Sequence, residues 1–156
     1  TYLSDEESLE GVVDDALVLQ KESLKNYEIR IEKVFHSIPN ISFQKAKLIH
    51  IFINVINNAK DAMLDTPKHM RTLKIAVDSD LTQVYLRFSD SGEGLMRDQL
   101  SLIFSHGYTT KKDGFGFGLH SCANYMTEMN GSMWAESEGP GKGTTIVLAF
   151  PIHEKT

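Results

Sequence analysis

The sequence contains a single cysteine, Cys122, among its 156 residues, so no disulfide can form within the chain. A lone cysteine is usual in a reducing compartment. The chain also lacks any apolar stretch near the roughly 20 residues that a membrane-spanning helix needs. Its first residues do not show the basic and then apolar pattern of a secretory signal peptide. We therefore expect a cytoplasmic location, with no direct membrane contact by this domain.

An excess of positive charge is missing as well. Sixteen lysines and arginines stand against 21 aspartates and glutamates, which gives a formal net charge of −5. Six of these acids lie within the first 15 positions, so the remainder of the chain is nearly neutral. A protein that holds nucleic acid by its phosphates needs a basic surface. We therefore expect no nucleic acid among the partners.

What is present is the composition of one globular domain. Apolar residues make up 41% and charged residues 24% of the chain, which excludes a disordered tail. The length suits a single domain over residues 1–156. Helical periodicity alternates with strands at hairpin spacing, which predicts a mixed sheet with helices on one face. The expected helices are 5–24, 42–64, 98–104 and 117–130, and the expected strands are 28–35, 73–77, 84–88, 132–137 and 144–150.

The helix expected over residues 42–64 has an unusual polar face. At about 100° per residue, one side is apolar and predicts contact with the core. The core-facing residues are Leu48, Phe52, Val55, Ile56, Ala59 and Met63, and the opposite side carries His50, Asn54, Asn57, Asn58 and Asp61. Asparagine is a weaker helix former than Glu, Lys or Arg, but its neutral amide oxygen suits Mg²⁺ beside phosphate oxygens. An incidental polar face is the alternative.

A glycine-containing turn, Asp90-Ser-Gly92-Glu-Gly94, directly follows an expected strand. Its glycines permit close approach of the backbone to a ligand. The Asp90 carboxylate accepts hydrogen bonds only and could take the exocyclic amine of adenine. By itself the motif is also compatible with a plain turn.

Two further glycine clusters follow. Residues 114–119 (G-F-G-F-G-L) open a helix, where backbone N–H groups can receive phosphate. The spacing is neither that of a Walker A loop nor that of a dinucleotide-binding fold. A flexible loop before the helix is the alternative. Residues 141–145 (G-K-G-T-T) lead into the final strand, and alone they are compatible with an ordinary hairpin turn.

Together and in this order, the motifs resemble the ATP-binding catalytic domain of sensor histidine kinases, in the GHKL superfamily shared with gyrase B and MutL. The resemblance covers about residues 4–151. The matching segments are 54–59 (N-V-I-N-N-A), 90–94 (D-S-G-E-G), 103–111 (I-F-S-H-G-Y-T-T-K), 114–119 and 139–145. The resemblance implies the Bergerat fold, an α/β (α+β) two-layer sandwich. Its mixed, mostly antiparallel sheet carries three main helices on one face.

The resemblance also implies roles for individual residues. Asn58 would hold Mg²⁺, with Asn54 supporting it or contacting phosphate. Asp90 would accept the adenine amine, helped by Thr145 through a water. Lys111 would approach the terminal phosphate, so the predicted catalytic residues are Asn54, Asn58 and Lys111. The predicted nucleotide-binding set is Asn58, Asp61, Asp90, Gly92, Gly94, Tyr108, Thr109, Thr110, Lys111, Gly114, Gly116, Gly118, Leu119 and Thr145.

The resemblance favours a kinase over a hydrolase. ATPases of the gyrase and MutL kind carry a glutamate base four residues before the metal-binding asparagine, and here that position is Asn54. Water attack profits from a base that an amide cannot supply. Phosphoryl transfer to another nucleophile depends mainly on positioning and charge neutralisation. An ATPase clamp that hydrolyses ATP to drive conformational change is the alternative, and a degenerate nucleotide-binding scaffold is a third hypothesis.

The kinase hypothesis implies partners outside this sequence. The acceptor histidine of such kinases is typically followed by an acidic residue within a helical hairpin, and only His153 has that neighbour, without a helix. We therefore expect a separate dimerisation/phosphoacceptor domain, a response regulator and a homodimeric parent kinase. The isolated chain should bind ATP and barely turn it over.

Three histidines depart from the family pattern: His50, His106 and His120. His106 and His120 could add charge near phosphate if protonated. Ordinary loop and helix-surface roles are the alternatives for both.

Overall fold

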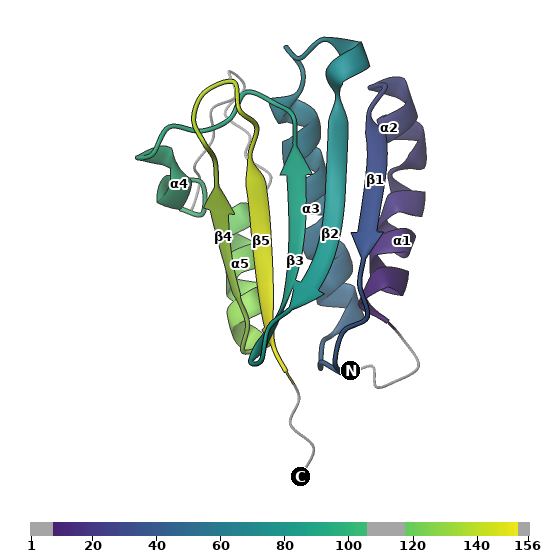
Figure 1. Ribbon diagram of the computed structural model, residues 1–156, viewed down its shortest axis with the longest axis vertical. Helices are drawn as coiled ribbons and strands as arrows, with labels where there is room; N and C mark the ends of the chain where they lie inside the picture. The colour runs from purple at the N-terminus through teal and green to yellow at the C-terminus, as the bar shows by residue number, and fades with distance from the viewer. Residues whose placement is uncertain (1–7, 106–117, 153–156) are drawn as a thin grey trace.

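The structure is a computed structural model that describes residues 8–105 and 118–152. Within them a five-stranded sheet has the order β1-β2-β3-β5-β4 (Figure 1). β1 is parallel to β2, and the other pairs are antiparallel, so the predicted mixed, mostly antiparallel sheet is confirmed. The strands are β1 (Arg30–Phe35), β2 (Thr72–Ser79), β3 (Gln83–Asp90), β4 (Ser132–Glu136) and β5 (Thr145–Pro151).

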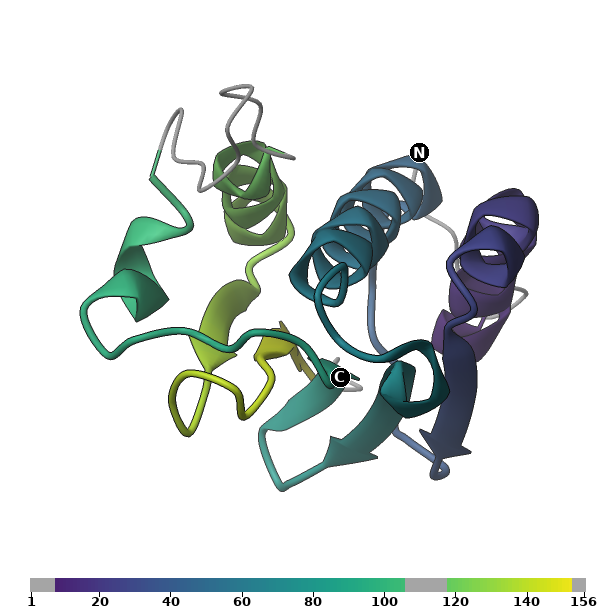
Figure 2. The same cartoon turned by 90° about the horizontal axis from the view of Figure 1, so that it is seen from above.

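The main helices lie in one layer against one face of the sheet, as the view from above shows (Figure 2). α3 is the central one, and it packs on α1, α5 and β3. The two-layer sandwich with three main helices is therefore confirmed. The helices are α1 (Leu9–Leu19), α2 (Lys21–Asn26), α3 (Lys45–Ala62), α4 (Gln99–Leu102) and α5 (Leu119–Glu128), with a 3₁₀ turn at Lys68–Met70.

The core lies between the two layers. Every residue that the sequence placed on the apolar side of α3 is buried. From the sheet, alternate side chains face the helices, as the burial pattern of β3 shows. Val84, Leu86 and Phe88 point inward and are at most 1% exposed. Asp90 continues this alternation, so the last residue of β3 turns its carboxylate toward the helix layer.

Two helix boundaries differ from the sequence prediction. The helix expected over 5–24 is two helices, α1 and α2. The buried stripe of α1 runs through Leu9, Val12, Val13 and Ala16. Leu19 continues this spacing, but it is the last residue of α1 and is 66% exposed. The start expected at residue 42 for the second helix was also wrong. Phe43 is buried in a bridge outside the helix, so α3 begins at Lys45 after Gln44.

Within residues 8–105 and 118–152, no helix has both the length and the apolar character to cross a membrane.

Candidate functional site

Asp90 is held by backbone groups at one end of the sheet. Its Oδ1 accepts the N–H of Gly92 at 2.9 Å and the N–H of Thr144 at 3.2 Å. Burial raises the pKa of the Asp90 carboxyl to about 6, because the charged form is penalised away from water. Its Oδ2 accepts no hydrogen bond from any residue that the structure describes. One oxygen is therefore fixed, and the other is left for a donor on a ligand.

Glycines bring three segments together around this carboxylate. A Cβ on Gly92 would lie 2.3 Å from the carbonyl oxygen of Ala62, at the end of α3. A Cβ on Gly143 would lie 2.2 Å from the carbonyl oxygen of Asp90. Distances under 3 Å exclude any side chain unless the backbone moves. Gly92, Gly94 and Gly143 therefore let segments of the chain pack closely against one another, and the approach of a ligand to Gly92 and Gly94 stays a prediction.

Hydrogen bonds also link the 90–94 turn to the start of β2 and to the residues just before it. The Ser91 hydroxyl donates to the carbonyl of Met70 at 2.7 Å and accepts the N–H of Thr72 at 2.9 Å. Nearby, Arg71 is buried and donates to the carbonyls of Tyr27, Leu64 and Thr66. These contacts fix the chain that leads from α3 into β2, next to the turn.

Asn54 and Asn58 each use the amide nitrogen within α3. The Asn54 amide nitrogen donates to the carbonyl of His50 at 2.8 Å, and the Asn58 nitrogen donates to the carbonyl of Asn54 at 2.8 Å. A carbonyl can only accept, so these bonds set which amide atom is nitrogen. Among the described residues neither Oδ1 accepts a hydrogen bond. Both oxygens can therefore serve a cation or a polar ligand.

The donor set fits a magnesium ion held jointly with phosphate. Within the described parts of the chain, no group of three or more His, Cys, Asp or Glu side chains could hold a metal. A neutral amide oxygen from Asn58 is a hard ligand, and Mg²⁺ is commonly bound through few protein ligands plus substrate phosphates. The residues present thus fit an ion that arrives with its nucleotide.

The first turn of α5 lies beside Asn54. Gly118 has a φ of +70°, and the position of a Cβ on it would be 3.7 Å from Asn54 Oδ1. The carbonyl of Gly118 accepts the Ser121 hydroxyl at 2.8 Å and the N–H of Cys122 at 3.1 Å. Leu119 is buried beneath this turn. The structure therefore brings the helix that starts at Gly118 next to the asparagine stripe.

A single helix connects the two ends of the site. The end of α3 at Ala62 touches Gly92, and Asn54 touches the start of α5. These two positions are eight residues apart, or about 12 Å along the helix axis. Asn58 lies midway between them. The arrangement is a strip with a carboxylate at one end and a helix start at the other.

Asp61 lies near other acids. Burial raises the pKa of Glu93, and the charges of Asp65 and Asp61 raise it further. The predicted role of Asp61 in nucleotide binding stays a prediction.

Thr144, which the sequence reasoning missed, contacts Asp90, whereas Thr145 does not. Thr144 is buried, and its backbone exchanges two hydrogen bonds with Asp90. Thr145 pairs with Ser89 across β3 and β5, and their hydroxyls are 2.8 Å apart. Alternation along β3 places Ser89 on the face opposite to Asp90. The sequence holds no pattern that indicates which of these two adjacent threonines contacts Asp90.

The remaining predicted residues lie outside the described parts of the chain. They are Tyr108, Thr109, Thr110, Lys111, Gly114 and Gly116.

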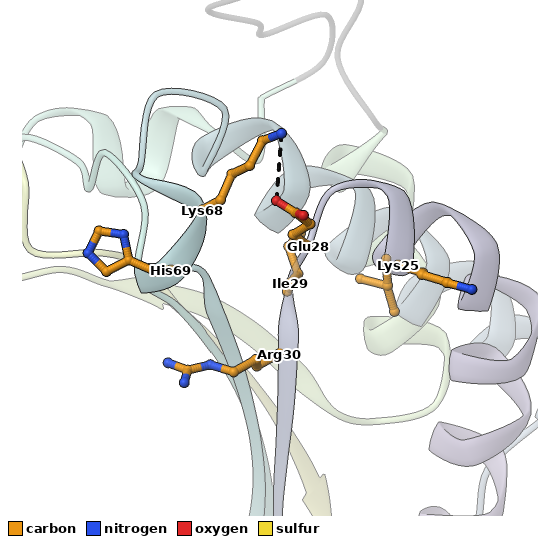
Figure 3. A pocket seen from close by; sticks show the side chains of 7 residues that line it. Lys25, Glu28, Ile29, Arg30, Lys68 and His69 are labelled. Carbon is orange, nitrogen blue, oxygen red and sulfur yellow. Dashed lines mark ion pairs between the residues drawn. The ribbon is translucent and has the colours of Figure 1, made fainter.

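A separate hollow of about 510 Å³ lies beside the start of β1. No predicted site residue lines it; its residues are Leu24, Lys25, Glu28, Ile29, Arg30, Lys68 and His69. Lys68 pairs with Glu28 at 3.6 Å across it, while Lys25 and Arg30 point in opposite directions (Figure 3). The cationic groups do not converge, so this hollow offers no site for an anion.

Comparison with known proteins agrees with this geometry. A family model described as histidine kinase-, DNA gyrase B-, and HSP90-like ATPase matches residues 44–154. The sensor histidine kinase TmoS of Ectopseudomonas mendocina is 29% identical over 90% of this chain and 15% of its own length. Sporulation kinase E of Bacillus subtilis (strain 168) is 32% identical over 85% of this chain and 17% of its own length. The chain thus spans under a fifth of either relative.

Solved structures show the same fold. The catalytic domain of histidine kinase ThkA superposes with a TM-score of 0.80 at 22% sequence identity, over 97% of this chain and 94% of that one. ThkA has also been solved in complex with a response regulator protein, TrrA. In that complex the TM-score is 0.76 at 19% identity, over 98% of this chain and 42% of that one.

Proposed function

This chain belongs to the family of histidine kinase-, DNA gyrase B- and HSP90-like ATPases. On this premise we propose that it is the ATP-binding catalytic domain of a sensor histidine kinase in two-component signalling. It binds Mg-ATP and donates the γ-phosphate to a histidine on a separate dimerisation/phosphoacceptor domain. A bond forms between the histidine nitrogen and the γ-phosphorus, the bond to the bridging oxygen breaks, and ADP leaves.

Asp90 carries the proposal. A desolvated carboxylate with one oxygen held by two backbone N–H groups is costly, and its second oxygen needs a donor. The exocyclic amine of adenine supplies that donor. The carboxylate is rigid before the ligand arrives, so binding requires little ordering of the pocket.

The strip along α3 then receives the rest of the nucleotide. With adenine at Asp90, the triphosphate extends along the amide oxygens toward Gly118, whose helix start offers backbone N–H groups. Asn58 would hold the magnesium ion, and Asn54 would support it or contact phosphate. The ion, when bound, neutralises charge on the phosphate oxygens. Lys111 and the other predicted contacts from residues 106–117 remain part of the proposal.

Asn54 favours transfer to a protein acceptor over hydrolysis. Its amide nitrogen donates to the His50 carbonyl, and an amide oxygen is too weak a base to activate water. The isolated chain should therefore hold ATP with little turnover. The proposed partners are the phosphoacceptor domain and a response regulator, within a homodimeric kinase at a cytoplasmic location.

The first test is a calorimetric titration of the chain with a non-hydrolysable ATP analogue, with and without Mg²⁺. We expect one-to-one binding that tightens with the metal. In Asn58→Ala, the increase in affinity that Mg²⁺ produces should be about tenfold smaller. The neighbouring Asn57→Ala is the matched control and should keep the full increase. An identical metal response in both variants would exclude Asn58 as the ligand.

The second test separates kinase from hydrolase. The chain is mixed with [γ-³²P]ATP and a purified histidine phosphoacceptor domain, and both labelled protein and released phosphate are counted. Labelled acceptor with little free phosphate supports the proposal. Sustained phosphate release by the chain alone would favour the ATPase clamp.

A further inference from the structure

His120 connects two elements that are separate in the sequence. It is the second residue of α5, and its Nδ1 lies 3.2 Å from the carbonyl oxygen of Phe104, just beyond α4. A carbonyl only accepts, so Nδ1 carries the hydrogen and donates. The other ring nitrogen, Nε2, lies 3.4 Å from the side-chain nitrogen of Asn124. Because an amide nitrogen only donates, Nε2 is the acceptor in this contact. Both ring nitrogens of His120 are thereby engaged.

The Phe104 end of this contact belongs to a weak element. α4 has four residues, and a helix of that length does not hold its own shape in water. Its position depends on contacts with the rest of the domain, such as those with β4. The contacts with β4 hold this segment in place, and the His120 bond links the first turn of α5 to it.

The His120 end belongs to the turn that faces the asparagine stripe. Gly118 is two residues earlier, and its carbonyl is already bonded to Ser121 and Cys122, so the first turn of α5 is well formed. On its opposite side this turn lies against Asn54. A shift of α5 relative to α4 would therefore move Gly118 relative to Asn54.

We propose that His120 is a positioning residue for the nucleotide triphosphate: its Nδ1–H holds the first turn of α5 against the end of α4, and so fixes the Gly118 and Leu119 N–H groups opposite Asn54. The inference rests on the proposed function, because it assumes that phosphate is received at this turn. It assigns His120 a role through hydrogen bonding and not through positive charge near phosphate.

Two conservative substitutions separate this role from simple packing. In His120→Asn the amide nitrogen can occupy the place of Nδ1 and still donate to Phe104. In His120→Gln the amide nitrogen falls near Nε2 instead, and the bond to Phe104 is lost. His120→Ala removes both contacts. Thermal unfolding and circular dichroism establish that each variant is folded.

The readout is the affinity for two ligands, a non-hydrolysable ATP analogue and adenosine, measured by NMR titration. We expect His120→Ala and His120→Gln to bind the ATP analogue about tenfold more weakly, the worth of one hydrogen bond to an ordered group. Their affinity for adenosine should be unchanged, and His120→Asn should stay within about twofold of the parent protein for both ligands.

Three results would overturn the inference. They are an unchanged ATP affinity in His120→Ala, an equal loss for adenosine, or a His120→Asn variant as weak as His120→Ala. The proposed function fails in a different way, because then the unmodified chain itself binds neither ligand, and the inference falls with it.

Discussion

The two ends of the site are constructed differently. The Asp90 end is formed by backbone contacts: glycines permit close approach, and backbone N–H groups fix one carboxylate oxygen. The Gly118 end is formed by side-chain hydrogen bonds of the α3 asparagines and of His120 in α5. Under the proposed function, base recognition would therefore be set in the fold before a ligand arrives. The Gly118 end, where phosphate would bind, depends on individual side-chain hydrogen bonds, so single substitutions there should have smaller and more selective effects.

The largest effect is expected from a substitution that breaks the backbone contacts at the Asp90 end. Gly143 and Gly141 have similar φ angles, +75° and +79°, but a Cβ meets the Asp90 carbonyl at Gly143 and nothing within 4 Å at Gly141. Gly141→Ala should lower the free energy of unfolding by about 1 kcal/mol, through backbone strain alone. Gly143→Ala should lower it by about 3 kcal/mol and abolish ATP binding, since overpacking is added. Urea unfolding measures both, and equal losses would contradict the crowding argument.

The next effect tests the carboxylate itself. Asp90→Asn keeps an oxygen for the N–H groups of Gly92 and Thr144, so the fold should survive, but it turns a donor toward the adenine amine. We expect about 100-fold weaker binding of ATP, because two donors then face each other without water. The variant should discriminate less against inosine triphosphate, whose base presents an acceptor there. Calorimetry with both nucleotides measures this, and unchanged ATP affinity would remove Asp90 from the adenine site.

A pH titration tests the Asp90 carboxyl in a second way, through its protonation. The Asp90 carboxyl has a pKa of about 6 in the folded protein, against an ordinary value of 3.8. The folded state therefore binds this proton more tightly than the unfolded state, and its contribution makes folding more stable as the pH falls from about 6 toward 4. Adenosine binding should move the opposite way and weaken by about tenfold per unit below pH 6, because only the ionised carboxylate accepts the amine.

Adenosine is the suitable ligand for this pH series because it has no ionisable phosphate. Glu93 also has a raised pKa, so the stability profile alone does not isolate Asp90. Asp90→Asn supplies the control. A pH dependence of adenosine binding that persists in this variant would assign the effect to another group.

The smallest expected effect concerns Thr145. Its hydroxyl bonds Ser89 on the sheet face away from Asp90, so Thr145→Val should cost about 1 kcal/mol of stability and change ATP affinity by less than about twofold. Thermal unfolding and calorimetry check the two parts. A large loss of affinity would support the water-mediated role that the resemblance implies for this residue.

Much of the site could be predicted from the sequence, since local patterns carry it. The periodicity of α3 places its asparagines opposite the core. The glycines at 92 and 94 mark a turn that no side chain could occupy. Helix ends were less predictable. The first helix ends at Leu19, which is exposed, and α3 begins at Lys45, after the buried Phe43.

Residue types at fixed spacing are enough to identify the family, the order of the elements and the chemistry of the strip: amide oxygens, a carboxylate and glycine turns. Three features depend on the folded chain: Thr144 contacts Asp90, burial raises the Asp90 pKa, and His120 reaches Phe104. Strand register, desolvation and helix-to-helix placement depend on contacts between segments far apart in the chain, and no local pattern encodes them.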